Sequence, residues 1–236
     1  MIVSVLRIVC AIFLSAFVAS LELLFIPFHR TGHLFHSLAR FHARSILAVC
    51  GVHVVVDGLA LVDFSRSYIY VANHASMFDI PAVIAAIPDQ IRIVYKKELE
   101  KIPIFGWGLK YGKTYISIDR GKGPDAIRSL DEAAEKIRRG ASVLLFAEGT
   151  RTSDGKLQPF KRGAFNLAVK AGVPVVPLTI NGSYKILKKG SLRITPGTIT
   201  LVLARPIEPP ASNGKNTEFQ LRDQVHDIIQ QQYVDQ

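Results

Sequence analysis

The chain has 236 residues, of which 49% are apolar, enough for one α/β domain with a full core or two small domains. This apolar fraction is high for a soluble enzyme and too low for a membrane protein with many spans. Lys and Arg (29) exceed Asp and Glu (19), and the net charge of +10 favours anionic partners: phosphorylated substrates, acidic lipid or nucleic acid. Cys10 and Cys50 form no CxxC motif, which indicates a reduced, intracellular catalytic domain.

Residues 2–28 form an apolar segment in which Arg7 and Glu22 are the only charged side chains. The segment is long enough to enter a membrane if Arg7 extends to the interface and Glu22 is tolerated. We therefore expect an uncleaved membrane anchor. A cleaved signal peptide and a buried core helix are the alternatives.

Residues 31–49 predict a second helix with an apolar stripe and several basic residues. Four of the seven histidines of the chain lie between residues 29 and 42. This pattern is typical of an amphipathic helix lying on an anionic leaflet. A metal cluster is the less favoured alternative, because no carboxylate or thiolate supports tetrahedral ligation there. We expect residues 1–50 to be a membrane-anchoring helix pair and residues 51–236 to be one catalytic domain.

From residue 52 onward, segments rich in Val and Ile alternate with helical patterns, which predicts an α/β fold with a mixed, mostly parallel sheet covered by helices. The last two strands are expected to form a hairpin around Pro196 and Gly197. The predicted helices are 124–139, 164–171 and one that begins at Thr217, and the predicted strands are 52–56, 67–72, 91–95, 114–118, 142–147, 174–180, 192–195 and 199–203.

His74 and Asp79 follow the second predicted strand and are five residues apart. On one helix they would lie about 140° apart, so contact requires His74 in the loop and Asp79 in the first helical turns, with Ser76 as the expected N-cap. A histidine oriented by a carboxylate can act as a general base. A locally satisfied histidine is the alternative. No GxSxG nucleophile is present, which favours direct attack by a substrate hydroxyl over an acyl-enzyme.

The second motif is Glu148-Gly149-Thr150-Arg151, at the carboxyl end of an apolar strand, where binding sites gather in α/β sheets. Arg151 can bind a phosphate with two parallel hydrogen bonds, and Gly149 lets the backbone come close to the phosphate. Glu148 is expected to bind a substrate hydroxyl or to pair with Arg151. A surface ion pair is the alternative. Further cations follow other strands or end the loop after Asp154 and Gly155, and together they would complete a phosphate pocket: Lys96, Arg120, Lys161 and Arg162. Lys97 and Lys122 are expected only to be solvated at the surface.

Residues 102–109 are apolar and punctuated by glycines. They are expected to be either a wall of an acyl-chain groove or ordinary core packing.

These residues resemble the 1-acylglycerol-3-phosphate acyltransferase family. The family's NHxxxxD block is matched at Asn73, His74 and Asp79, and its FPEGTR block at Phe146 and 148–151, with Ala147 in place of the usual proline. Its two other blocks resemble residues 115–120 and 173–177. The resemblance covers roughly residues 50–205, with the four blocks in the family's order.

The resemblance implies a glycerolphosphate acyltransferase-like fold with His74 as the catalytic base and Asp79 as its partner. It implies that Arg151, Glu148, Gly149, Thr150, Arg120 and Lys96 bind the glycerol phosphate. It also implies lysophosphatidate as acceptor, acyl-CoA or acyl-carrier-protein as donor, and no metal or bound cofactor. The expected location is the cytoplasmic membrane, or its equivalent, with the catalytic domain facing the cytoplasm.

Two rival interpretations remain open. The acceptor could instead be glycerol 3-phosphate or a lyso-aminolipid. From a different class, a basic nucleic-acid-binding or membrane-binding module would also suit the charge, although the basic residues are dispersed and no nucleic-acid motif is present. Backbone N–H groups after His74 are the expected donors to a reaction oxyanion.

Overall fold

The computed structural model describes residues 2–25, 33–112, 115–118, 124–209 and 217–234. The helices and strands, in chain order, are α1 (Ile2–Phe25), α2 (His33–Cys50), β1 (Val52–Asp57), η2 (Leu59–Leu61), β2 (Ile69–Ala72), α3 (Asp79–Ala86), β3 (Arg92–Lys96), η3 (Lys97–Lys101), α4 (Phe105–Gly112), β4 (Ile116–Ile118), α5 (Pro124–Arg138), β5 (Val143–Phe146), α6 (Gly163–Ala171), β6 (Val175–Asn181), α7 (Ser183–Ile186), β7 (Gly197–Leu203) and α8 (Thr217–Gln232).

The strands form one seven-stranded mixed sheet in the order β1-β7-β6-β2-β5-β3-β4. β2 lies at its centre, parallel to both β5 and β6, and β3 is parallel to β5 and β4. β7 is antiparallel to β6 and parallel to β1. The predicted fold class, a mixed and mostly parallel sheet covered by helices, is confirmed. The carboxyl ends of β2 to β6 therefore meet at one edge of the sheet.

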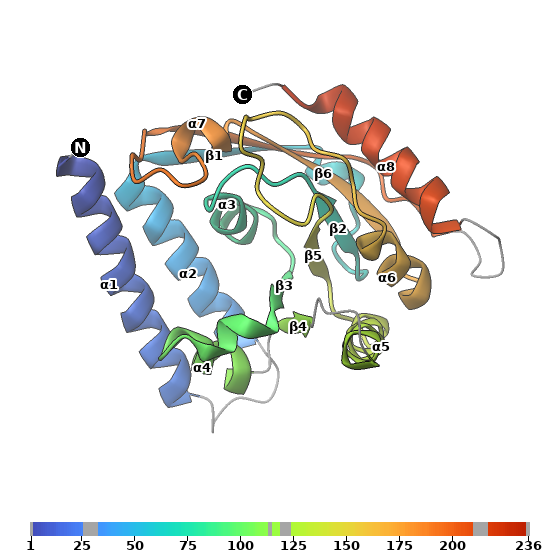
Figure 1. Ribbon diagram of the computed structural model, residues 1–236, viewed down its shortest axis with the longest axis horizontal. Helices are drawn as coiled ribbons and strands as arrows, with labels where there is room; N and C mark the ends of the chain where they lie inside the picture. The colour runs from blue at the N-terminus through green and yellow to red at the C-terminus, as the bar shows by residue number, and fades with distance from the viewer. Residues whose placement is uncertain (1, 26–32, 113–114, 119–123, 210–216, 235–236) are drawn as a thin grey trace.

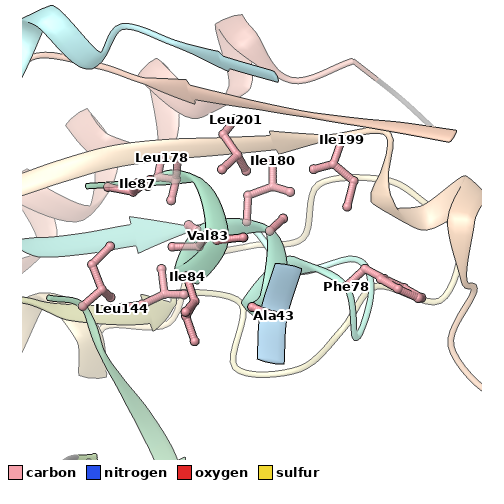
Figure 2. Packing of buried hydrophobic residues seen from close by; sticks show 14 of the residues in the cluster. Ala43, Phe78, Val83, Ile84, Ile87, Leu144, Leu178, Ile180, Ile199 and Leu201 are labelled. Atoms are coloured by element: carbon pink, nitrogen blue, oxygen red, sulfur yellow. The ribbon is translucent and has the colours of Figure 1, made fainter. Parts of the chain in front are cut away.

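Helices cover both faces of the sheet (Figure 1). α2 and α3 pack on one face in a core that includes Val83 and Ile84 of α3 together with Leu144, Leu178 and Ile180 of the strands (Figure 2). α5, α6 and α8 cover the other face in a second core. Burial of both faces explains why the central strands consist almost entirely of apolar residues.

The predicted strand at 192–195 is wrong, and so is the hairpin around Pro196 and Gly197. The segment before β7 is extended but unpaired with any strand, and its backbone polar groups bond elsewhere. Ser4 Oγ of α1 donates to the carbonyl oxygen of Ile194 (3.3 Å) and accepts the Ile194 N–H (3.2 Å). A helix at the start of the chain thus takes the place of a neighbouring strand.

Two basic residues of α2, Arg40 and His36, contact the end of α3 or lie beside that contact. Arg40 donates to the carbonyl oxygens of Ile84 (3.3 Å) and Ile87 (2.9 Å), at the C-terminal end of α3. A cation stabilises a helix C-terminus because the last carbonyl groups lack partners within the helix. His36 is buried beside Arg40, and burial followed by that positive charge lowers the pKa of its imidazole to about 4. Arg40 therefore joins α2 to α3, with His36 packed beside it.

α1 is the one helix in the described ranges that is long and apolar enough to cross a membrane, as judged by length and composition. One side of it packs against α2. Its outer side exposes large apolar residues along the whole helix, among them Leu6, Val9, Phe13, Phe17 and Leu24.

Candidate active site

His74 lies in the loop after β2, and Asp79 is the first residue of α3, the arrangement expected from their spacing. His74 Nδ1 is 2.6 Å from Asp79 Oδ2. The same carboxylate oxygen accepts the N–H groups of Ala75 (2.8 Å) and Ser76 (2.9 Å), and Asp79 is fully buried. Ser76 is not the N-cap of α3, because Phe78 occupies that position.

The contact with Asp79 determines the tautomer of the imidazole ring. A carboxylate that faces Nδ1 favours a proton on that nitrogen and leaves a lone pair on Nε2. The His74 ring also stacks on Phe146, with 3.8 Å between ring centroids and 15° between planes. Because the side chain keeps 16% of its surface exposed, Nε2 can meet a substrate hydroxyl.

Asn73 anchors this loop to the neighbouring strand. Its Nδ2 donates to the carbonyl oxygen of Ile180 (2.9 Å), and its Oδ1 accepts the Ile180 N–H (2.8 Å). Ser76 Oγ adds a hydrogen bond to the carbonyl oxygen of Leu187 (2.9 Å). The backbone on both sides of His74 is therefore fixed, as a positioned base requires.

Glu148 lies directly behind the histidine loop. Its side chain is buried, and Oε1 accepts the backbone N–H of His74 (3.1 Å), while Oε2 has no hydrogen-bond partner in the described part of the chain. The expected alternative, an ion pair with Arg151, is not seen between these two described residues. Burial, reinforced by the nearby charge of Asp79, raises the pKa of Glu148 to about 8, and the His74 N–H opposes this shift.

The stability of the Glu148→Gln variant should depend less on pH than the stability of the parent protein. The pKa of Glu148 rises from 4.5 to about 8 on folding, so the folded state favours the protonated carboxyl. This contribution to stability is full below about pH 4.5 and is lost as pH rises through about 8, at about 1.4 kcal/mol per unit of pKa difference. Glutamine keeps an acceptor for the His74 N–H but carries no charge, so its stability should fall less between pH 5 and 9.

Thermal unfolding of both proteins at several pH values measures this difference. Glu98→Gln, at an exposed position in η3, is the matched control and should behave as the parent does. Parallel stability curves for the parent and Glu148→Gln would show that Glu148 is not the group that titrates.

The turn at 149–151 adjoins the histidine loop and carries positive charge. The Thr152 N–H donates to the carbonyl oxygen of His74 (2.9 Å), which ties the two motifs together. Gly149 has φ of +73°, and a Cβ built on it would lie 3.0 Å from Lys161 Nζ, so a side chain there would be both strained and crowded. Lys189 Nζ donates to Thr150 Oγ1 (3.3 Å) and to the carbonyl oxygen of Arg151 (3.2 Å).

Lys161 and Lys189 thus bring their charges to the turn that carries Arg151, which adjoins the histidine loop through the Thr152 N–H. The sequence did not indicate a role for Lys189, because a pair of lysines before a glycine is also the usual pattern of a solvent-exposed turn. Lys96 ends β3 at the same edge of the sheet. Arg120 and Lys122 lie outside the described residues.

An apolar cavity of about 220 Å³ opens between α1, α2, α3, β3 and α4. Its lining is mostly aliphatic and aromatic, with Val18, Ala43, Ile84, Ile93, Leu109 and Tyr115 among the residues. Among the side chains of 102–109 that the structure describes, Leu109 lines it, so the described part of the expected groove wall is that position. A cavity of this chemistry suits a fatty acyl chain.

Comparisons with known proteins agree with this geometry. The family profile described as Acyltransferase matches residues 53–181. The 1-acyl-sn-glycerol-3-phosphate acyltransferase of Cocos nucifera is 33% identical over 181 residues, which is 76% of this chain and 56% of that protein. A chloroplastic enzyme of the same name from Arabidopsis thaliana is 34% identical over 187 residues, 78% of this chain and 51% of that protein.

Among solved structures, the 1-acyl-sn-glycerophosphate acyltransferase PlsC of Thermotoga maritima superposes with a TM-score of 0.81 at 28% identity. The match covers 98% of this chain and 93% of that one. The chain spans about half the length of the two plant proteins. The family profile covers more than half of the chain and includes both motifs, so the protein belongs to the acyltransferase family.

Proposed function

We propose that the protein transfers a fatty acyl group from an acyl thioester to the sn-2 hydroxyl of 1-acylglycerol 3-phosphate and thereby forms phosphatidate. The observation that carries the proposal is the His74–Asp79 contact, placed beside the cationic turn at Arg151. The names of the plant relatives and of the Thermotoga maritima enzyme support the choice of acceptor.

In the proposed reaction, His74 Nε2 takes the proton of the sn-2 hydroxyl as its oxygen attacks the thioester carbonyl carbon. The tetrahedral intermediate collapses, the carbon–sulfur bond breaks, and His74 returns the proton to the departing thiolate. Among the N–H groups after His74 that are expected as oxyanion donors, those of Ala75 and Ser76 already donate to Asp79.

The donor carrier, CoA or acyl carrier protein, is a substrate in this scheme, and no resident cofactor or metal takes part. Arg151, Glu148, Gly149 and Thr150 contact the glycerol phosphate side, with Lys96 and Arg120 as further phosphate ligands. Lys189 adds a cation that the sequence did not indicate. The acyl chain enters the cavity bounded by α1 and α4.

Assays of the purified full chain in mixed micelles test the proposal. Lysophosphatidate, glycerol 3-phosphate and lyso-aminolipids are offered with CoA and carrier-protein thioesters in turn. Lysophosphatidate should give the highest kcat/KM. Preference for glycerol 3-phosphate or a lyso-aminolipid would overturn the acceptor assignment but keep the chemistry. Activity with none of them, together with binding to nucleic acid, would favour the binding-module interpretation.

We further propose that residues 1–50 anchor the catalytic domain, residues 51–236, at the cytoplasmic membrane or its equivalent, with the active site facing the cytoplasm. The exposed apolar side of α1 supports burial in lipid, and the net charge of +10 supports attraction to an anionic leaflet.

Salt and detergent should act differently on the membrane-bound full chain. Salt screens charge over about 10 Å at 0.1 M but leaves apolar burial intact. High salt should therefore leave the protein in the sedimented membrane fraction, and detergent should release it. Immunoblotting of both fractions measures the outcome. Release by salt alone, or a mature N-terminus cleaved after α1, would contradict the anchor.

A further inference from the structure

The segment formed by η3 and α4 covers the apolar cavity with one side and turns a second apolar side outward. Leu109 lines the cavity. Ile104, Trp107 and Tyr111 instead expose 38%, 47% and 52% of their surfaces. Trp107 and Tyr111 are four residues apart in α4 and therefore lie on one side of the helix, and Ile104 directly precedes it. We call these three exposed residues the α4 patch.

The α4 patch adjoins the exposed side of α1. α4 lies against the C-terminal part of α1 (Figure 1). Gly108, buried in α4, faces this helix, since a Cβ built there would lie 3.5 Å from Glu22 Oε2. Phe17 and Leu24 of α1 are 59% and 65% exposed. The outward apolar surface of α4 thus continues the one through which α1 enters lipid in the function proposed above.

The chemistry of the patch suits the boundary between lipid headgroups and acyl chains. Trp and Tyr concentrate at that depth because each ring is apolar and carries one polar group. Lys101 and Lys110 are exposed beside the patch, and Lys110 Nζ lies 5.4 Å from the centre of the Tyr111 ring. Their charges complement an anionic leaflet, although Glu98 on the same segment offsets part of that attraction.

Ile104 adds a backbone feature. Its φ is +65°, a conformation that β-branched residues rarely adopt. Ile104 lies at the entry of α4, where packing within the chain leaves 38% of it uncovered. Backbone strain of this kind is found at contact sites as well as at active sites.

We propose that α4 is a third membrane-contacting element, which inserts Trp107 and Tyr111 at headgroup level at the rim of the acyl cavity. This inference rests on the membrane association proposed above. Its occupant is lipid, and a second copy of the chain is the competing occupant that the test separates from it.

Trp107 is the only tryptophan in the sequence, so its native fluorescence reports on the patch without a label. The full chain is reconstituted into vesicles of phosphatidylglycerol and phosphatidylcholine in equal parts, the latter brominated either near the headgroup end or near the methyl end of its chains. Quenching by bromine is compared with quenching by aqueous iodide. Co-sedimentation with the vesicles is measured on the same samples.

The matched control moves the tryptophan to the opposite side of the fold, in the double variant Trp107→Phe/Gln224→Trp. Gln224 is exposed on α8, which covers the other face of the sheet from α2 and α3. This tryptophan should be quenched by iodide and should not respond to brominated lipid.

In the native chain, Trp107 emission should shift to the blue on reconstitution, with stronger quenching by the shallow bromine than by the deep one and reduced quenching by iodide. Co-sedimentation with Trp107 fully open to iodide would overturn the inference and leave the α1 anchor standing. Shielding from both quenchers would assign the patch to a second copy of the chain and also overturn it. Failure to co-sediment would overturn the anchor and this inference together, while acyltransferase activity in mixed micelles remains a separate measurement.

Discussion

The His74→Ala variant should lose about 10²- to 10⁴-fold in kcat, the range for removing a positioned general base. The backbone contacts of His74 with Glu148 and Thr152 do not involve its side chain, so the loop should keep its position. Initial rates at saturating substrate measure this loss.

Asp79→Asn examines the partner of the base. Asparagine can still accept the N–H groups of Ala75 and Ser76, but it no longer offers a charged acceptor to His74 Nδ1. The imidazole can then adopt the wrong tautomer, and the loss should be similar to or smaller than that of His74→Ala. His53→Ala, at an exposed position on β1, is the control and should keep the parent rate. A folded His74→Ala enzyme with more than a tenth of the parent rate would refute the mechanism.

Local sequence was sufficient for most of the fold because the strands are short apolar runs bounded by glycine and polar residues. β2, predicted as 67–72, is observed at Ile69–Ala72, and β5, predicted as 142–147, at Val143–Phe146. The same signal predicted a strand at 192–195 that is not observed. Ile194 in this segment hydrogen-bonds to Ser4 of α1 and not to a neighbouring strand. Composition reports that a segment is extended, but its partner is set by tertiary structure.

Local sequence likewise predicts one part of the active site but not the rest. The histidine–aspartate contact follows from spacing and a helix start, both of which are local. The pairing of Asn73 with Ile180, 107 residues away, depends on β6 lying beside β2, and no local pattern encodes that order. Lys189 reaches the Arg151 backbone for the same reason, from a turn after α7. Arg40 resembled a headgroup-binding residue because the sequence does not reveal that α3 ends beside it.

The Arg151→Ala variant should lose about 2–4 kcal/mol of transition-state binding, or roughly 30- to 1000-fold in kcat/KM, mainly through a higher KM for lysophosphatidate. The reason is that a half-buried guanidinium can make two parallel hydrogen bonds to one phosphate. Truncation of Arg151 leaves the negative charge of the phosphate without this partner. Arg151→Lys should recover little, because an ammonium group cannot offer the planar fork.

Arg193→Ala, at an exposed position, removes the same charge from the surface and is the matched control. It separates a lost phosphate contact from a weaker attraction of the whole protein to anionic lipid, and its KM for lysophosphatidate should stay near that of the parent. If Arg151→Ala raises the KM of the thioester and leaves that of the acceptor unchanged, Arg151 binds the donor. The phosphate of the acceptor must then be held by the other cations at this edge of the sheet, of which Lys161 and Lys189 lie nearest to the turn.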